Sequence, residues 1–339
     1  MNFGIPSDDH RGDGNFFMNN QKSLHGDEAF DNGVIYLPLS ACVFAKDDIH
    51  EHNWTPILRT IAEGRSFTIQ YCKKCGIGLT DPVPTEATLP ALYAAAAEQG
   101  DSNFEVIGSG VIDRLKDYFA RTELLNISKL GGIVDVCRIA DFGCGNGRYA
   151  IAATQVFPGA QVDAVDYQSV PPPALRDMKE PQIHFKEVND WLNGDECFDL
   201  IVLRHVLEHN HDPVGLLRKL RRKLKPKGIL YVEVPNLESW WVGRLGKRVN
   251  TLGVPFHLLH FTHQSLAEAM KQSGLDAKIR TNDMPLAGTA LALLLDRPKS
   301  RSMQFLGIIL HPAQMIAAAI FGKACLHAIA RPTGDHQSG

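Results

Sequence analysis

Residues 139–150 read IADFGCGNGRYA, and this stretch decides the predicted fold. An apolar run ends at Phe142 and is followed by glycine at three alternate positions, Gly143, Gly145 and Gly147. Glycine adopts positive φ angles without steric penalty and lets a ligand approach the backbone closely. We therefore predict a strand, a tight turn and a helix N-terminus, which together form a site for a nucleotide-like ligand. A glycine-rich turn that holds no ligand is the alternative.

The spacing of the glycines distinguishes this turn from the dinucleotide-binding pattern. That pattern is G-x-G-x-x-G, whereas here the third glycine comes one residue earlier and Asp141 precedes the first. The resulting D-x-G-x-G-x-G resembles motif I of the class I S-adenosylmethionine-dependent methyltransferases. The resemblance implies that the acid helps to hold the methionine end of the cofactor and that the turn passes beneath it. It assigns cofactor contacts to Asp141, Gly143, Cys144, Gly145 and Gly147.

The composition sets limits on the class of protein. With 339 residues the chain is long enough for a large core and a second domain. Hydrophobic residues make up 44% and charged residues 22%, an ordinary soluble composition. Lys and Arg total 35 against 38 Asp and Glu, so no basic excess indicates nucleic acid as a partner. Because the seven cysteines are scattered and no signal-peptide pattern is present, we expect a reducing, cytoplasmic setting.

A second strand is predicted at residues 161–166 (QVDAVD), and it ends in an acid. A carboxylate at this end of strand two can accept hydrogen bonds from both ribose hydroxyls, so Asp166 is the predicted ribose ligand, followed by Tyr167 in the cofactor set. After a third short strand, the resemblance assigns the adenine amino group to Asp190. For Trp191, stacking on the adenine ring and packing in the core are both open.

The nearly unbroken apolar run 198–203 (FDLIVL) predicts a central parallel strand covered on both faces. It leads to Arg204 at the carboxyl edge of the sheet, where open α/β folds bind ligands. The run 198–236 looks like the ubiquinone-biosynthesis-type methyltransferases, although Lys227 stands where a second glycine is usual. The resemblance implies an α/β fold: a Rossmann-like seven-stranded methyltransferase sheet with helices on both faces, plus a small N-terminal module.

Helices are also predicted around the sheet. Residues 111–125 carry apolar side chains at helical spacing, namely Ile112, Leu115 and Phe119. Asp212-Pro213 is a helix start signal for the segment that ends near Leu224. The basic run in this segment, which includes Arg218, Arg221 and Lys225, is interpreted as a solvated helix face.

Histidines near the predicted fourth strand are candidates for catalysis. Methyl transfer to a hydroxyl needs a positioned acceptor and a base, and free imidazole titrates near neutral pH. His205 is the first choice as base and His257 the second. In the alternative, Glu208 and His209 join a histidine of the cluster 257–263 around Mg2+, in similarity to the small-RNA 2′-O-methyltransferases. We favour the metal-free base, because Mg2+ prefers oxygen ligands. Capping or core packing is the structural alternative for each histidine.

A possible metal centre lies near the N-terminus. Cys72 and Cys75 form a C-x-x-C pair. The stretch YCKKCGIGLTDPVPTEATLPALY resembles the zinc-ribbon module that precedes many bacterial methyltransferases of sugars and cell-surface polymers. The zinc ligands would be Cys42, Cys72 and Cys75, with His50 and His52 as further donors. Because Ala45 stands where a fourth cysteine is expected, a metal-free remnant of this module is the alternative.

The domain organisation follows from these segments. We predict a disordered arm at 1–33, a degenerate zinc-ribbon-like module at 34–93, a helical linker at 94–137 and a methyltransferase domain at 138–335. The domain carries an apolar insertion at 303–321.

The insertion 303–321 is broken by Pro312, whereas a spanning helix needs about 20 clean apolar residues. Two short helices in a membrane interface, with Arg297, Lys299 and Arg301 near anionic lipid, or burial against the protein are the alternatives. Peripheral contact with the inner leaflet would give access to a lipid-linked acceptor.

The predicted function is O-methylation by S-adenosylmethionine of a sugar, lipid-linked glycan or quinone-like small molecule. The alternative is a non-catalytic S-adenosylmethionine-binding or scaffold protein. An NAD-dependent oxidoreductase is disfavoured by the glycine spacing. The acceptor and the oligomeric state do not follow from the sequence, because the family shares its cofactor half and varies its substrate loops.

Overall fold

The structure is a computed structural model of the whole chain. It describes residues 28–29, 35–37, 42–44, 54–62, 65–89, 91–93, 107–176, 178, 182–239, 242, 252–282, 305–307, 309–310, 312–313, 316 and 323–333. The predicted arm at 1–33 therefore lies outside the described residues except for 28–29, and so do residues 94–106 of the predicted linker.

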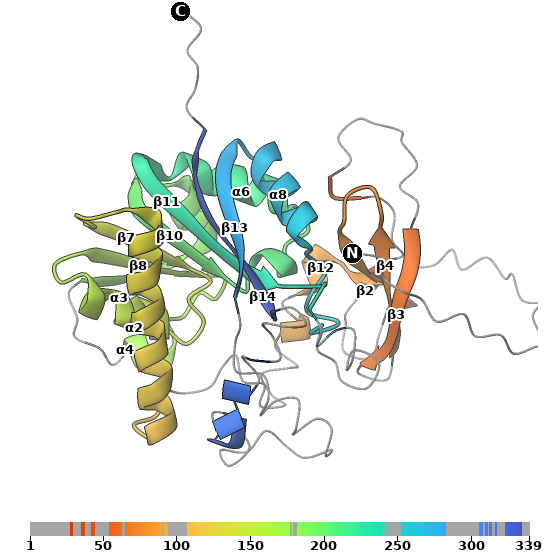
Figure 1. Cartoon of the computed structure of the whole chain (residues 1–339), viewed down its shortest axis with the longest axis horizontal. Helices are drawn as coiled ribbons and strands as arrows, with labels where there is room; N and C mark the ends of the chain where they lie inside the picture. The colour runs from red at the N-terminus through yellow and green to blue at the C-terminus, as the bar shows by residue number, and fades with distance from the viewer. Residues whose placement is uncertain are drawn as a thin grey trace, which may run out of the picture.

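A seven-stranded sheet forms the centre of the molecule (Figure 1). Its strands stand in the order β13-β14-β11-β10-β7-β8-β9. In chain order they are β7 (Arg138–Phe142), β8 (Gln161–Asp166), β9 (Ile183–Glu187), β10 (Phe198–Arg204), β11 (Leu224–Pro235), β13 (Leu275–Asn282) and β14 (Cys325–Pro332). Only β14 runs antiparallel to its neighbours in this sheet. The predicted seven-stranded Rossmann-like α/β fold is confirmed.

The strand order changes direction beside β7. The chain moves from β7 to β8 and β9 on one side, and β10 then pairs with the other edge of β7. Phe142 is in register with Val165 on one side and with Leu203 on the other, so the carboxyl ends of these strands are level. Such a switch point is where open α/β sheets leave a crevice for ligands.

Helices cover both faces of the sheet (Figure 1). One layer contains α2 (Val111–Gly131) and α3 (Arg148–Val156), and the other contains α5 (Val188–Asn193), α6 (Pro213–Arg222) and α8 (His263–Gln272). Alternate strand residues serve the two layers: Leu200 and Val202 pack with α2 and α3, whereas Ile201 and Leu203 pack with α6 and α8. This is why the fourth strand is apolar throughout.

The buried face of α2 differs from the prediction. The helix buries Ala120, Leu124 and Ile127 against the sheet, while the predicted contact Phe119 is 45% exposed. The predicted helix does pack on the sheet, and Ile112 and Leu115 are half-buried, but the prediction was wrong for Phe119. The reason is that the second half of the helix crosses the sheet, whereas its first half extends beyond the strands (Figure 1).

The N-terminal module consists of two small sheets. One contains β3 (Trp54–Ala62), β4 (Arg65–Cys72) and β5 (Gly78–Asp81), and its fourth strand, β12 (Leu259–His260), comes from the C-terminal half of the chain. The other contains β1 (Glu28–Ala29), β2 (Ile35–Leu37) and β6 (Val83–Pro84). Ile77 and Leu79 belong to the same hydrophobic cluster as residues of α6 and α8, so the module and the helix layer on this side of the large sheet share a core.

Short helical segments complete the fold. They are η1 (Glu86–Thr88), α4 (Pro173–Arg176) and η3 (Leu207–His209). The predicted apolar insertion lies between β13 and β14, and part of it is described, between residues 305 and 316. Among the described residues no helix has both the length and the apolar character needed to cross a bilayer.

Candidate functional site

The glycine turn connects β7 to α3 at the switch point. Gly143, Gly145 and Gly147 have φ angles of 79°, 53° and 83°. A Cβ on Gly143 would lie 2.2 Å from Cγ2 of Val206, so the loop after β10 packs directly on the turn. A Cβ on Gly145 would meet no atom within 4 Å. The turn is therefore closed at Gly143 and open at Gly145, where a ligand can approach the backbone.

Asp166 ends β8 and faces this turn. Its carboxylate accepts the amide of Gly145 at 2.9 Å and the amide of Gln168 at 3.3 Å. The side chain of the adjacent Tyr167 is 56% exposed and lies edge-on to Phe142. The amides of Gly143 and Cys144 instead donate to the carbonyl of Val165, and the Cys144 side chain is buried. The open surface of the turn thus consists of Gly145, Asp166 and Tyr167.

Asp141 is a buried carboxylate below the turn. It is 6% exposed, and its Oδ2 has no hydrogen-bond partner in the part of the chain that the structure describes. Burial raises the pKa of Asp141 to about 7, although the charge of Arg204 and the amide of Ala150 oppose this shift. An ammonium group beside Oδ2 would satisfy this oxygen and stabilise the ionised carboxylate.

Arg204 is held by a charged network from three elements. Its guanidinium lies 2.7 Å from Glu233 on β11 and 3.4 Å from Glu123 on α2, and it stacks over the ring of Tyr149 at 4.2 Å. Burial alone would lower the pKa of Arg204, but the two glutamates and the neighbouring tyrosines raise it well above its ordinary value. The guanidinium is therefore a permanent positive charge beside Asp141.

The predicted adenine contacts lie in different environments. Trp191 is 1% exposed, its indole N–H donates to Asp163 at 3.0 Å, and its ring packs on Phe142 and Phe198. Trp191 therefore packs in the core, which was one of the two alternatives. Its prediction as a cofactor-binding residue is corrected. Asp190 is exposed in the first turn of α5.

His205 follows β10 and lies between two acids. It is the one non-glycine residue with positive φ among the described residues, at 51°. Its Nδ1 is 3.3 Å from Glu208, and its Nε2 is 3.3 Å from Glu233. Burial alone would lower the pKa of His205, but the two carboxylates outweigh burial and raise it to about 9. His205 is therefore protonated at neutral pH and is a poor proton acceptor.

Glu208, His209 and His257 form a second group beside His205. Each offers one ligand atom within 4.8 Å of the others, and Glu208 Oε1 lies 3.9 Å from His257 Nε2. Burial alone would raise the pKa of Glu208, yet the surrounding histidines lower it to about 2. Burial, reinforced by His209, lowers the pKa of His257 to about 3. An ionised carboxylate and a neutral imidazole thus lie side by side.

His209 has a defined orientation. Its Nδ1 lies 2.8 Å from the carbonyl of Phe256 and 2.8 Å from the hydroxyl of Tyr93. A carbonyl oxygen only accepts, so Nδ1 carries the proton and donates, which leaves the lone pair of the neutral ring on Nε2. This tautomer is inferred from the contacts. His209 can therefore accept a proton at Nε2.

The remaining histidines of the cluster 257–263 do not join this group. His260 is 3% exposed and its Nε2 contacts Thr80 at 2.9 Å. His263 opens α8 and is exposed. The structure therefore brings together His205, Glu208, His209 and His257.

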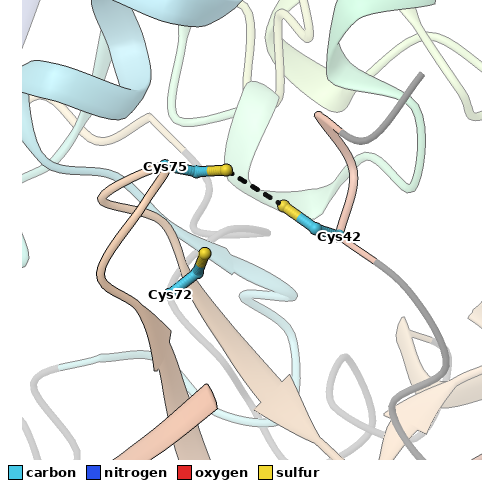
Figure 2. A group of neighbouring side chains, drawn as sticks. All are labelled: Cys42, Cys72 and Cys75. Atoms are coloured by element: carbon cyan, nitrogen blue, oxygen red, sulfur yellow. Dashed lines mark hydrogen bonds between the residues drawn. The ribbon is translucent and has the colours of Figure 1, made fainter. Parts of the chain in front are cut away.

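Three cysteines gather at the base of the N-terminal module, as Figure 2 shows. Cys72 and Cys75 flank the turn after β4, and Cys42 approaches from the preceding segment, with its Sγ 3.5 Å from that of Cys75. All three are buried, and their sulfur atoms lie within 4.8 Å of one another. The further donors suggested by the sequence, His50 and His52, lie outside the described residues.

Comparison with known families identifies the large sheet. Residues 109–278, about half of the chain, match a family described as a methyltransferase domain. The chain belongs to this methyltransferase-domain family. The resemblance first suggested by the glycine turn is confirmed, and the family match begins ahead of α2.

Relatives of this methyltransferase domain differ in substrate. Acetylserotonin O-methyltransferase of Mus musculus is 29% identical over 191 residues, which cover 53% of this chain and 44% of the mouse protein. Ubiquinone biosynthesis O-methyltransferase of Histophilus somni is 27% identical over 158 residues, covering 38% of this chain and 63% of that protein. The chain thus spans less than two thirds of these relatives.

Among solved structures, the Burkholderia thailandensis 1,6-didemethyltoxoflavin-N1-methyltransferase, with bound 1,6-didemethyltoxoflavin and S-adenosylhomocysteine, gives a TM-score of 0.46. It is 16% identical, and the match covers 82% of this chain and 100% of that chain.

Several residues of the methyltransferase domain's site were missed in the sequence. Glu233 had a signal, because it is a lone charge inside the apolar strand ILYVEV. Glu123 had no such signal, because a charged residue on a predicted helix is common. Tyr93 and Thr80 belong to the N-terminal module, and their contacts span 116 and 180 positions of the chain. No local pattern could reveal them.

Proposed function

We propose that this chain is an S-adenosylmethionine-dependent methyltransferase that acts on oxygen. One observation carries the proposal: the buried Asp141 carboxylate with its unpartnered oxygen lies below a turn that is open at Gly145. A cationic amino-acid group fits the carboxylate, and an uncharged nucleoside fits a turn without a phosphate cradle. The match to the methyltransferase-domain family supports the same assignment.

Residues at the carboxyl edge of the large sheet (the rim) would each hold a different part of the cofactor. We propose that Asp141 holds the ammonium group, that the Gly143–Gly147 turn lies under the cofactor and that Asp166 accepts from the ribose hydroxyls. Asp166 now accepts the amide of Gly145, so this acid already faces the turn. Tyr167 and Asp190 are exposed and would lie beside the adenine ring. The positive charge of Arg204 would favour the ionised form of Asp141.

His209 is the proposed general base in place of the first choice, His205. Two carboxylates keep His205 protonated at neutral pH, with a pKa of about 9. His209 presents a lone pair on Nε2, and the ionised Glu208 nearby would stabilise the imidazolium that forms. His257, the second choice, has a pKa lowered to about 3 and would be a weaker base. S-adenosylmethionine, when bound, supplies an electrophilic methyl group.

A metal ion is the alternative for the same group of side chains. One carboxylate and two imidazoles within 4.8 Å suit a zinc-like ion better than Mg2+, which prefers an all-oxygen shell. In that case His209 and His257 would polarise the acceptor hydroxyl through the ion and would not remove its proton themselves. Methyl transfer that resists EDTA supports the base, whereas loss with EDTA and recovery with Zn2+ supports the ion.

Cofactor binding and turnover test the main proposal separately. Isothermal titration calorimetry with S-adenosylmethionine and with NAD is expected to show binding of the first alone. Labelled methyl transfer to glycan, lipid and quinone extracts should fall about 100-fold or more in His209→Gln, with cofactor affinity unchanged. Binding without transfer to any extract would favour the non-catalytic alternative, and failure to bind S-adenosylmethionine would overturn the assignment.

The acceptor is proposed to be a small molecule, a glycan or a lipid-linked glycan. The insertion between β13 and β14 supports the last, because Asn282 and Cys325 pair beside Pro235 at the carboxyl end of β11, on the rim that carries the site. Phe305, Ile309 and Ile316 are 51%, 58% and 66% exposed on it. We propose contact with anionic lipid there. Flotation with phosphatidylglycerol vesicles tests this, and protein that stays unbound at low salt would contradict it.

The cysteine group is proposed to hold zinc. Thiolate ligands about 2.3 Å from a tetrahedral ion are about 3.8 Å apart, close to the observed arrangement. Atomic emission should find one zinc per chain, lost in Cys75→Ser but retained in the exposed Cys137→Ser. Protein without zinc would indicate the metal-free remnant.

A further inference from the structure

The N-terminal module contacts the histidine group at two points. Tyr93, which follows η1, places its hydroxyl 2.8 Å from Nδ1 of His209. Thr80 on β5 is fully buried and places its Oγ1 2.7 Å from the carbonyl of His257. Both contacts come from outside the matched range 109–278. The family region therefore does not contain the complete surroundings of its own histidines.

The contacts at Thr80 have one consistent pattern of protons. The Thr80 hydroxyl has one hydrogen, and the carbonyl of His257 can only accept it. His260 must then donate from Nε2 to Thr80 Oγ1, where the distance is 2.9 Å. Thr80 thus ties two histidines of the segment 257–260, which also pairs with β5 through β12. The module fixes the backbone that carries His257.

The contact at Tyr93 bears on His209 in the same way. Burial, and then the charge of Glu208, raises the pKa of Tyr93, so its hydroxyl stays neutral. The Nδ1–H of His209 is shared between the Tyr93 oxygen and the Phe256 carbonyl, each 2.8 Å away. The Tyr93 ring also packs 5.5 Å from that of Phe256. These contacts hold His209 in one rotamer and one tautomer.

We propose that Tyr93 and Thr80 are positioning residues for methyl transfer, so that the N-terminal module is a working part of the active site. This inference rests on the proposed function. The Phe256 carbonyl keeps the proton of His209 on Nδ1, and Tyr93 accepts from the same N–H and orients the ring. Thr80 keeps the His257 segment against β5. Neither residue touches the reacting atoms.

Tyr93→Phe keeps the ring and removes the hydroxyl. One lost hydrogen bond to an orienting group should lower kcat about fivefold to tenfold, with the Kd for S-adenosylmethionine unchanged. His211→Ala is the matched control, because its ring joins the same loop to the module at the carbonyl of Pro84, 2.9 Å away, without contacting His209. An equal loss of kcat in both variants would reduce Tyr93 to a docking contact and overturn the proposal.

A second readout does not depend on activity. In protein with 15N-labelled histidine, the His209 signals, assigned with His209→Gln, should report a proton on Nδ1 in both the wild type and Tyr93→Phe, because the Phe256 carbonyl remains. The Nδ1 signal should shift in Tyr93→Phe, because this N–H loses one of its two acceptors. This result supports the contact even if no methyl acceptor is found. Unchanged His209 shifts in Tyr93→Phe would overturn the contact, and changed shifts with unchanged kcat would overturn the positioning role.

The pair Thr80→Val and Thr80→Ser tests the other contact. Valine removes the hydroxyl at nearly constant volume and should lower kcat, while serine keeps the hydroxyl and should restore it. Loss of kcat in the valine variant with rescue by serine supports the proposal. Equal activity in both variants, or equal loss in both, would remove Thr80 from it.

Discussion

Asp141 is the residue whose ionisation should set the pH dependence of cofactor binding. Burial raises its pKa from 3.8 to about 7. An ammonium group binds the ionised carboxylate, so affinity for S-adenosylmethionine should fall as pH drops through 7, approaching tenfold per pH unit below it. Calorimetry at pH 6, 7 and 8 measures this dependence, and Asp141→Asn should bind weakly and without the pH trend. Wild-type affinity that is constant over this range would contradict the role.

The same carboxylate has the opposite effect on the cofactor-free fold. A folded-state pKa above the unfolded value means that the neutral acid is favoured by folding. The stability contributed by Asp141 is therefore present below about pH 3.8 and is lost as pH rises through about 7. Above about pH 7 the buried, ionised Asp141 therefore destabilises the cofactor-free fold, and this is the pH range in which the proposed ammonium group would bind it.

Sequence patterns pointed to Asp141 and Asp166 of the proposed cofactor site, but they did not reveal the protonation state of the histidines. Asp141 and Asp166 are set by local order along a strand and its turn, which a pattern can reveal. The pKa of His205 is raised by Glu208, three residues further along the chain, and by Glu233 on a neighbouring strand, 28 residues further along. Only the fold brings Glu233 to His205 and buries the pair of carboxylates around the ring, so the choice of His205 as base could not be checked from the sequence.

At the scale of elements, two glycines of the β7–α3 turn should affect different properties: Gly143 the stability of the fold and Gly145 the binding of the proposed cofactor. Gly143→Ala brings a Cβ against Val206 at φ 79°, so it should lower the unfolding temperature by several degrees. Gly145→Ala meets open space at φ 53°, so only backbone strain of about 1 kcal/mol opposes it. Its methyl group would instead occupy the open side of the turn, where the cofactor is proposed to bind.

Thermal unfolding and calorimetry on both variants measure the two effects. Gly145→Ala should unfold close to the wild type yet bind S-adenosylmethionine at least tenfold more weakly, while Gly143→Ala should lose stability first. The reverse ranking would place the ligand elsewhere on the turn.

A strand could be predicted from the sequence where it lies in the central sheet and is covered on both faces. Strand β8 spans residues 161–166, as the acid-terminated apolar run indicated, because its pattern reflects burial in the central sheet. Strand β12 has two residues, and its partner β5 lies about 180 positions earlier. Nothing in two residues encodes such a pairing. The prediction for Phe119 on α2 was wrong for a related reason, because the position of the helix over the sheet decides which of its residues are buried.

Across the whole molecule, one hydrophobic cluster extends from the N-terminal module into the large sheet. Ile77 and Leu79 share it with Leu216, Leu217 and Leu266. Thr262 also donates to the carbonyl of Gly76 at 2.8 Å. A module that shares its core and its sheet with the methyltransferase domain cannot unfold alone without exposing both, so we expect a single cooperative unfolding transition.

Leu79→Ala tests this expectation in the intact protein. Leu79 is 3% exposed on β5, and truncation of a buried leucine costs about 2–5 kcal/mol. If the two parts unfold as one, the single calorimetric transition should shift to lower temperature, and the unfolding measured by bound S-adenosylmethionine should shift with it. Ile61→Ala, a 75% exposed apolar residue on β3 of the same module, is the control and should leave the transition nearly unchanged. Two separate transitions, of which Leu79→Ala moves only one, would mean that the module is an independent unit and that its contacts with the histidines are not held by a common core.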